Sequence, residues 1–309
     1  MTTSTADKKF AQVVQRIEPQ SRLLRVWELK GGVSAQVTAL EVERPDGLTH
    51  KMIVRRHGPR DLKRNPQIAA EEFKLLHLVH SAGLAVPMPY YLDQSGEIFP
   101  TPYIVIEYIE GKSEFALSHV PDFMLQLATH LSWIHRIGGQ GEPRIGGQRD
   151  LSFLPRIESI VATKLGERPL KVDESLNEGS IRDALEAAWP FPQPNPSVLL
   201  HGDFWPGNLL WKDSQLVAII DWEDAMLGDP LADVANTRLE LLWAFGIDAM
   251  QDFTHQYQSL TAIDFSNLPY WDLYAALRPI ATLAQWGLDP ITEKTMREQH
   301  RWFVTQALR

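Results

Sequence analysis

The sequence of 309 residues contains no cysteine, and this absence removes several classes of chemistry. Disulfide bonds, thiolate zinc sites, iron–sulfur clusters and cysteine nucleophiles are all excluded. Long hydrophobic runs are missing too, since no apolar stretch approaches the roughly 20 residues that span a bilayer. The N-terminal residues also lack the apolar core and the cleavage pattern of a signal peptide. Together these absences predict a soluble, cytoplasmic protein with no membrane partner.

Basic residues are also in short supply. Lys and Arg total 30 against 39 Asp and Glu, which gives a formal net charge of −9. This balance argues against a nucleic-acid partner, because phosphate contacts need clustered cations. The charge is unevenly divided, since residues 1–80 carry a net +5 and residues 81–309 a net −14. The division indicates either two surfaces with different partners or two faces that are merely solvated differently.

The first third of the sequence has the pattern of a β-rich unit. The turn sequence Pro45-Asp46-Gly47 separates two strand-like runs and favours a hairpin. A helix is predicted over residues 67–81 from its apolar spacing, and Gly83 is placed to end it. Pro87 and Pro89 indicate a loop. Strands are predicted at residues 22–28, 35–43, 48–56 and 103–109.

Beyond about residue 120 the pattern becomes helical. Two short apolar runs, at 198–200 and 216–220, predict short strands within this helical part. Because strands and helices are segregated along the chain, we predict an α+β fold with domains at residues 1–109 and 110–309. Helices are predicted over 122–135, within 151–188 and over most of 231–309, with a loop at 138–150.

Three polar residues follow the two short strands. Asp203 comes after the first strand, Asn208 lies five residues later, and Asp221 ends the second strand. We expect these two strands to pair, so that the three side chains can converge on one point. Carboxylate and amide oxygens suit Mg²⁺, which takes its other ligands from water and nucleotide phosphates, so the pattern fits a phosphoryl-transfer site. The alternative is that all three are turn residues with local hydrogen bonds.

The spacing of these residues resembles that of aminoglycoside phosphotransferases and choline kinases. His201-Gly202-Asp203 with Asn208 matches the HGDxxxxN motif of that group, followed by Ile220-Asp221-Trp222-Glu223 and by Gly228-Asp229-Pro230 with Asp233. The resemblance implies a protein-kinase-like fold of two lobes, a small antiparallel sheet with one helix and a larger helical lobe. It implies that Asp203 is the catalytic base, that Asn208 and Asp221 bind Mg²⁺, and that Asp233 braces the catalytic loop. His201 is predicted to support this loop structurally.

The same resemblance requires a cation on the third strand to hold the nucleotide phosphates. Strand alternation places Ile53 and Arg55 on one face and Arg56 on the other. In the family the residue two before the cation faces the adenine, so the resemblance implies Arg55 for the phosphates and Ile53 for the adenine. The family often has Lys at this position, so the arginine is a departure with a different reach and geometry. The alternative is that both arginines are surface residues of the strand.

Further nucleotide contacts are implied by the resemblance. A carboxylate on the following helix should pair with the cation, and apolar spacing favours Glu72 over Glu71. The phosphates would contact the turn of residues 31–34, including Gly32 and Ser34, although these residues also fit an ordinary hairpin turn. Adenine would pair with backbone groups of Glu107 and Ile109, near the end of the strand predicted at residues 103–109.

The resemblance predicts an enzyme, a small-molecule kinase that uses ATP and Mg²⁺ to phosphorylate a hydroxyl group. The acidic C-terminal part favours a cationic acceptor such as an aminoglycoside or an amino alcohol. Arg278 stands in an apolar context and favours an anionic acceptor instead. Two other functions stay open: a non-catalytic nucleotide-binding regulator on the same fold, and a metal-dependent hydrolase that uses the acidic cluster.

Overall fold

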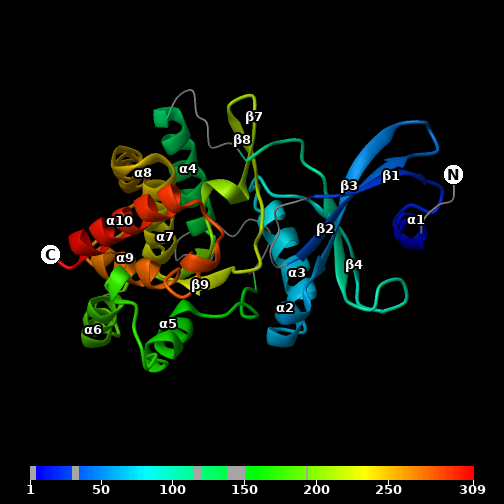
Figure 1. Ribbon diagram of the computed structural model, residues 1–309. Coiled ribbons are helices and arrows are strands. Elements are labelled where there is room, and N and C mark those ends of the chain that lie inside the picture. The colour runs from blue at the N-terminus through cyan, green and yellow to red at the C-terminus, as the bar shows by residue number, and fades with distance from the viewer. Residues whose placement is uncertain (1–4, 30–34, 114–119, 138–149, 193) are drawn as a thin grey trace. The chain divides into compact units, whose positions relative to one another are not determined.

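The computed structural model describes residues 5–29, 35–113, 120–137, 150–192 and 194–309 (Figure 1). The chain divides into two compact units. Unit 1 comprises Met1–Gly111 and Val217–Glu223, and unit 2 comprises Lys112–Leu216 and Asp224–Arg309. The predicted domains are continuous in sequence, whereas unit 1 also contains the short segment that carries Asp221.

Unit 1 is built on an antiparallel sheet of five strands in the order β1-β2-β3-β5-β4. The predicted hairpin between β2 and β3 is confirmed: Gly47 takes a φ of 82°, and the Asp46 side chain accepts a hydrogen bond from the amide of Leu48 (3.0 Å). Pro89 begins a strand rather than a loop, because β4 lies at an edge of the sheet, where a missing amide donor costs little. The strands are β1 Arg22–Glu28, β2 Ala35–Glu43, β3 Thr49–His57, β4 Pro89–Asp93 and β5 Tyr103–Glu107.

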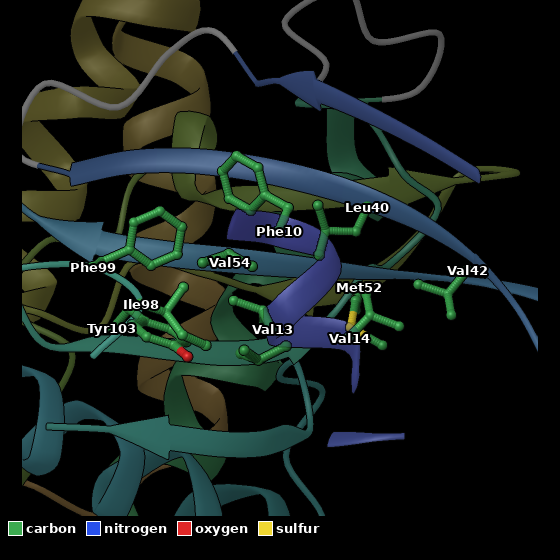
Figure 2. Close-up of a cluster of buried hydrophobic side chains, with 11 residues drawn as sticks. Phe10, Val13, Val14, Leu40, Val42, Met52, Val54, Ile98, Phe99 and Tyr103 are labelled. Carbon is green, nitrogen blue, oxygen red and sulfur yellow. The ribbon is translucent and has the colours of Figure 1, made fainter. Parts of the chain in front are cut away.

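One face of this sheet is covered by helix α1, Thr5–Ile17, which the sequence patterns did not indicate. Figure 2 shows Phe10, Val13 and Val14 of this helix facing apolar side chains of the strands. Each fully buried side chain of this kind contributes about 1.5–3 kcal/mol to folding. Arg56 belongs to the same side, since its guanidinium lies 4.4 Å from the centre of the Phe99 ring. The sheet residues in this cluster include Leu40, Val42, Met52, Val54, Tyr103 and Val105.

Two helices follow the third strand: α2, Pro59–Arg64, and α3, Ile68–Ser81. The predicted helix over 67–81 is therefore confirmed to within one residue. It packs against β3, β4 and β5 through buried residues such as Leu75, Leu76 and Val79. Gly83 has a φ of 84° just after the helix, which glycine adopts without steric cost.

Unit 2 is mainly helical, as the sequence predicts. Helix α7, Leu231–Phe245, is buried along most of its length and packs against α8, α9 and α10, while α4 packs against α8. None of the helices in the described part of the chain combines the length and apolar character that crossing a bilayer requires. The other helices are α4 Val120–His135, α5 Ile157–Gly166, α6 Glu178–Ala188, α8 Ile247–Leu260, α9 Leu268–Leu277 and α10 Pro290–Ala307, with 3-10 turns η1 Glu174–Leu176, η2 Pro206–Asn208 and η3 Leu283–Gln285.

The expected pairing between the two short strands is wrong. Strand β6, Val198–Leu200, pairs antiparallel with β9, Met226–Gly228. Strand β8, Gln215–Ile219, pairs instead with β7, Leu209–Lys212. A two-residue turn with positive φ at both positions joins β7 to β8, and such turns match the strand twist, so the local hairpin forms. The α+β fold class itself is confirmed.

Candidate active site

The loop after β6 is held from beneath by a buried carboxylate. Asp233, in the first turn of α7, is 2 % exposed. Its Oδ2 accepts a hydrogen bond from the amide of His201 (2.7 Å), and its Oδ1 accepts one from the amide of Gly202 (2.9 Å). Gly202 has a φ of 83°, and a Cβ there would lie 2.0 Å from the carbonyl oxygen of Asp224. Two successive amides therefore share one carboxylate, which fixes the backbone immediately before Asp203.

Two further side chains, which the sequence patterns did not single out, extend this network. His135, at the end of α4, places its Nε2 3.2 Å from Asp233 Oδ2, and its Nδ1 lies 2.6 Å from the hydroxyl of Tyr257 on α8. Burial raises the pKa of Tyr257, and the charge of Asp233 raises it further, so the hydroxyl keeps its proton and donates to Nδ1. Nε2 then carries the ring proton and donates to Asp233. The carboxylate thus has three donors.

The carboxylate of Asp233 is ionised despite its burial. Burial alone would raise the pKa of Asp233, but the hydrogen bond from His135 and the contacts with His201 lower it below its ordinary value. His201 is fully buried, and its Nδ1 accepts a hydrogen bond from the amide of Asp203 (3.3 Å). This position matches the supporting role predicted for His201. Its ring also lies edge-on to Phe204.

Asp203 and Asn208 lie together in unit 2. The side-chain Nδ2 of Asn208 donates to both the carbonyl oxygen and Oδ2 of Asp203, each at 3.0 Å. The short turn η2 makes this contact possible, because the amide of Asn208 donates to the carbonyl of Trp205 (2.9 Å). Asn208 is buried, and no hydrogen bond to its Oδ1 is found within the described residues. The amide group is therefore oriented with its oxygen as the available atom.

A second cluster of charged residues lies in unit 1, centred on Arg55. Its Nε donates to Glu72 Oε2 (3.2 Å), and its Nη2 donates to Asp221 Oδ1 (2.7 Å) and to Glu223 Oε2 (2.6 Å). Burial lowers the pKa of Arg55, but the charges of these three carboxylates raise it above its ordinary value. Glu71 is engaged elsewhere, as it accepts a hydrogen bond from Asn65 (2.7 Å). The structure thus brings Arg55 together with Glu72.

His57 joins this cluster, and sequence reasoning missed it. It lies two residues after Arg55 on β3 and therefore on the same face of the sheet. Its Nε2 is 2.8 Å from Glu72 Oε2, and its Nδ1 is 3.8 Å from Glu223 Oε2. Burial would raise the pKa of Glu72, but Arg55 and His57 lower it below its ordinary value. The period-two pattern of the strand was the signal that could have identified His57.

The backbone of Asp221 has a φ of 66°, a left-handed conformation that is uncommon for residues other than glycine. Such conformations cost of order 1–3 kcal/mol and persist where surrounding contacts hold them, as the ion pair with Arg55 does here. Asp221 is the most exposed carboxylate of the Arg55 cluster, with 29 % of its side chain accessible. Its second oxygen is thus open to a ligand.

The other predicted nucleotide contacts lie in unit 1 or outside the described residues. Ile53 shares the sheet face of Arg55 and pairs with Ile106 of β5. Glu107 ends β5, and its amide donates to the carbonyl of Met88 (2.8 Å), while Ile109 follows the strand and is half-buried. Gly32 and Ser34 fall within residues 30–34, outside the described part of the chain.

The model of the phosphotransferase enzyme family matches residues 26–277 of the sequence. The chain belongs to this family. The match includes both the Arg55 cluster and the loop held by Asp233, so the resemblance to this family expected from the motifs is confirmed. As a member of the phosphotransferase family, the chain also shares its fold with solved enzymes.

Solved structures of two such phosphotransferases illustrate the shared fold. The GDP complex of aminoglycoside 2′-phosphotransferase-IIIa has a TM-score of 0.64 at 15 % identity, with 96 % of this chain and 98 % of that chain covered. Macrolide 2′-phosphotransferase MphH from Brachybacterium faecium has a TM-score of 0.62 at 15 % identity, with 94 % and 96 % covered. At these identities the likeness shows the fold alone, which is the protein-kinase-like fold predicted from the motifs.

Two proteins with similar sequences match different shares of this chain. Acyl-CoA dehydrogenase family member 11 of Rattus norvegicus is 24 % identical over 254 residues, which is 73 % of this chain and 32 % of the relative. Hygromycin-B 4-O-kinase of Escherichia coli is 31 % identical over 81 residues, which is 26 % of this chain and 23 % of the relative. The phosphotransferase chain thus spans about a third of the acyl-CoA dehydrogenase relative.

Proposed function

We propose that the protein is an ATP- and Mg²⁺-dependent phosphotransferase that moves the γ-phosphate to a hydroxyl group of a small molecule. The observation that carries this proposal is the pair Asp203 and Asn208, oriented toward each other on a loop whose backbone is held by the buried Asp233. Relatives in the family support it, since their names include a hygromycin-B kinase and their structures include complexes with GDP and with AMP-PNP and hygromycin B.

Asp203 acts as the base in this proposal. Its Oδ2 is fixed by Asn208 Nδ2, so the carboxylate has a defined direction before any substrate binds. The acceptor hydroxyl gives its proton to Asp203 as the bond between its oxygen and the γ-phosphorus forms. The bond from that phosphorus to the β-phosphate oxygen breaks, and ADP leaves with the electron pair. General bases of this kind contribute about 10²–10⁴-fold to the rate.

The residues proposed for Mg²⁺ suit that ion chemically. Asn208 uses its nitrogen for Asp203, which leaves the amide oxygen as the ligand, and Asp221 offers a partly exposed carboxylate. Hard oxygen donors of this type are the ligands that Mg²⁺ prefers, and few protein ligands are needed because phosphates and water complete its shell. When bound, Mg²⁺ would neutralise charge on the phosphates.

Arg55 is proposed to hold the nucleotide phosphates. Its Nη2 is shared between Asp221 and Glu223, while Nε is held by Glu72. The Glu72 contact fixes the guanidinium on the sheet, and Nη2 is the part that can be drawn to phosphate. Nucleotide binding would also involve Gly32 and Ser34, with the adenine beside Ile53 and bonded to the backbone of two residues, Glu107 and Ile109.

The proposal is tested with the full chain by two measurements. Calorimetry with Mg·ATP measures nucleotide binding, and release of ADP is measured with a panel of aminoglycosides, amino alcohols, sugars and hydroxy acids. We expect Mg²⁺-dependent binding of ATP and acceptor-dependent release of ADP. Binding with no transfer to any acceptor would instead indicate a nucleotide-binding regulator, and absence of binding would contradict the proposal.

A further inference from the structure

Arg278, directly after α9 in unit 2, makes a single side-chain hydrogen bond among the described residues. Its Nη1 donates to Asn236 Oδ1 on α7 at 2.7 Å. Among the described residues, no carboxylate oxygen lies within ion-pair distance of this guanidinium. The side chain is partly buried, so a bound anion there would be less screened by solvent than at an exposed site.

A second arginine, Arg238, also lies between helices α7 and α9, but its donors are paired with acceptors of the protein. Arg238 on α7 donates from Nε and Nη2 to the two carboxylate oxygens of Asp272 on α9, each at 3.0 Å. Its Nη1 donates to Thr254 (2.6 Å). Arg238 therefore has a bidentate carboxylate partner within the fold, and Arg278 has a neutral amide in the equivalent role.

The amide that holds Arg278 is itself incompletely paired. Asn236 is 6 % exposed, and its buried Nδ2 has no hydrogen-bond partner among the described residues. A buried donor left unpaired costs about 1–3 kcal/mol, and such groups are rare in folded proteins without a ligand or water to satisfy them. The atoms that lack partners here are donors: the Asn236 Nδ2 and the remaining guanidinium nitrogens. Donors are completed by a ligand that accepts, and an amine would add only further donors.

Glu240 supplies a further polar group one helical turn after Asn236 and on the same face of α7. Burial raises the pKa of Glu240 to about 8, and the negative charge of Asp203 contributes to the rise, while Arg278 opposes it. At neutral pH the carboxyl group is thus mostly protonated and can donate a hydrogen bond. It does not cancel the charge of Arg278 in that state.

These groups stand next to the proposed catalytic loop. Helix α7 carries Asp233, which holds the loop before Asp203, and Thr237, whose hydroxyl donates to the carbonyl of Phe204 (2.9 Å). Asn236 and Glu240 belong to the same rigid helix. The charge of Asp203 also acts on Glu240. An acceptor that presents its hydroxyl to Asp203 and extends along this face of α7 would bring its other end toward these donors.

We propose that Arg278, Asn236 and Glu240 bind a carboxylate group of the acceptor, so that the substrate class is the hydroxy acids. This inference rests on the proposed phosphotransferase function and specifies its acceptor. It decides against the cationic acceptor suggested by the overall acidity of the unit, because the unpaired groups nearest the loop are donors. The acidic residues of that loop are engaged in hydrogen bonds or proposed for metal binding.

The test compares three matched sets of compounds with Mg·ATP: hydroxycarboxylates of increasing chain length, the corresponding hydroxyamides and the corresponding amino alcohols. Release of ADP and the mass of the phosphorylated product are measured. We expect hydroxycarboxylates to be the preferred acceptors. Arg278→Gln should raise their KM roughly 10- to 150-fold, the effect of losing one hydrogen bond between charged groups, and Arg278→Lys should restore part of the loss.

A second variant keeps the experiment decisive if Arg278→Gln folds poorly. Asn236→Asp places a carboxylate opposite Arg278, as Asp272 stands opposite Arg238, so the fold gains an ion pair while the anion site closes. We expect a folded protein with a KM for hydroxycarboxylates raised by at least tenfold. The matched control is Lys294→Gln, which removes one positive charge from an exposed position of α10 and should leave this KM unchanged.

Three results would overturn the inference. The first is a kcat/KM for amino alcohols or hydroxyamides that equals the value for hydroxycarboxylates. The second is an unchanged KM for hydroxycarboxylates in both Asn236→Asp and Arg278→Gln. Either of these two results would remove the acceptor assignment while leaving a working phosphotransferase. A protein that binds Mg·ATP yet phosphorylates none of the three sets, nor any sugar or aminoglycoside, would remove the proposed function and the acceptor assignment together.

Discussion

Replacing Asp233 by Asn tests whether the buried carboxylate holds the loop before Asp203. The side chain accepts hydrogen bonds from the amide of His201 on one oxygen and from the amide of Gly202 on the other, with His135 Nε2 as a third donor. Asparagine has nearly the same shape, but one of its two terminal atoms is a donor. Whichever way it is placed, that NH₂ group faces a backbone amide that cannot accept.

The cost follows from these contacts. The cheaper orientation leaves the Gly202 amide as a buried, unpaired donor, which costs about 1–3 kcal/mol. Loss of the negative charge weakens the bonds from His201 and His135 by about 1 kcal/mol each, the difference between charged and neutral hydrogen bonds. We therefore expect Asp233→Asn to lower the free energy of unfolding by about 3–5 kcal/mol at pH 7.

Urea denaturation of the full chain measures this difference as a shift in midpoint. The matched control is Asp289→Asn, because Asp289 caps α10 at an exposed position and Asn caps helices equally well, so its change should stay within about 0.5 kcal/mol. The pKa of Asp233 is lowered by His135 and His201 against the effect of burial. The difference in free energy of unfolding between wild type and Asp233→Asn should therefore stay constant above about pH 4 and decline as the pH falls below about 3.9. Equal stability of Asp233→Asn and Asp289→Asn would refute the reasoning.

Three further changes probe other contacts. Arg55→Met leaves the buried Glu72 without its cation and should cost about 3–5 kcal/mol by urea denaturation, with Arg55→Lys recovering only part; a neutral result would argue against the ion pair. Gly202→Ala should lower the melting temperature, because its Cβ would meet the Asp224 carbonyl at 2.0 Å, whereas Gly96→Ala, with open space around it, should lower it less. Glu240→Gln should gain stability relative to wild type as the pH rises from about 4.3 to 8, because the wild-type carboxyl ionises in this range only in the unfolded chain. If the urea midpoints of variant and wild type differ by the same amount at pH 5 and at pH 8, this prediction is contradicted.

Local sequence patterns were sufficient for much of the fold. Period-two alternation and the Pro45-Asp46-Gly47 turn located β2 and β3, and apolar spacing located α3 and favoured Glu72 over Glu71 as the residue that faces Arg55. These features depend on residues within about ten positions of one another. The motif spacing around Asp203 also located the loop and its brace Asp233, because the family motif records those contacts.

Contacts between distant segments were not predictable in this way. The pairing of β6 with β9 rather than with β8, and the cover provided by α1, depend on which apolar surfaces meet in three dimensions. The Tyr257–His135–Asp233 chain joins three separate helices, and no local pattern marks a buried histidine as a partner of a particular aspartate. The same holds for Asn236, whose unpaired amide becomes visible only when its neighbours are placed.

Transfer of phosphate by wild-type protein and by Asp203→Asn, side by side, tests the central claim most directly. Mg·ATP labelled on the γ-phosphate is supplied with the best acceptor from the panel, and labelled product is counted while nucleotide affinity is measured separately. The account predicts transfer by the wild type, a turnover lowered about 10²–10⁴-fold in Asp203→Asn, and unchanged affinity for ATP. Equal turnover in the two proteins would contradict the assignment of Asp203 as the base.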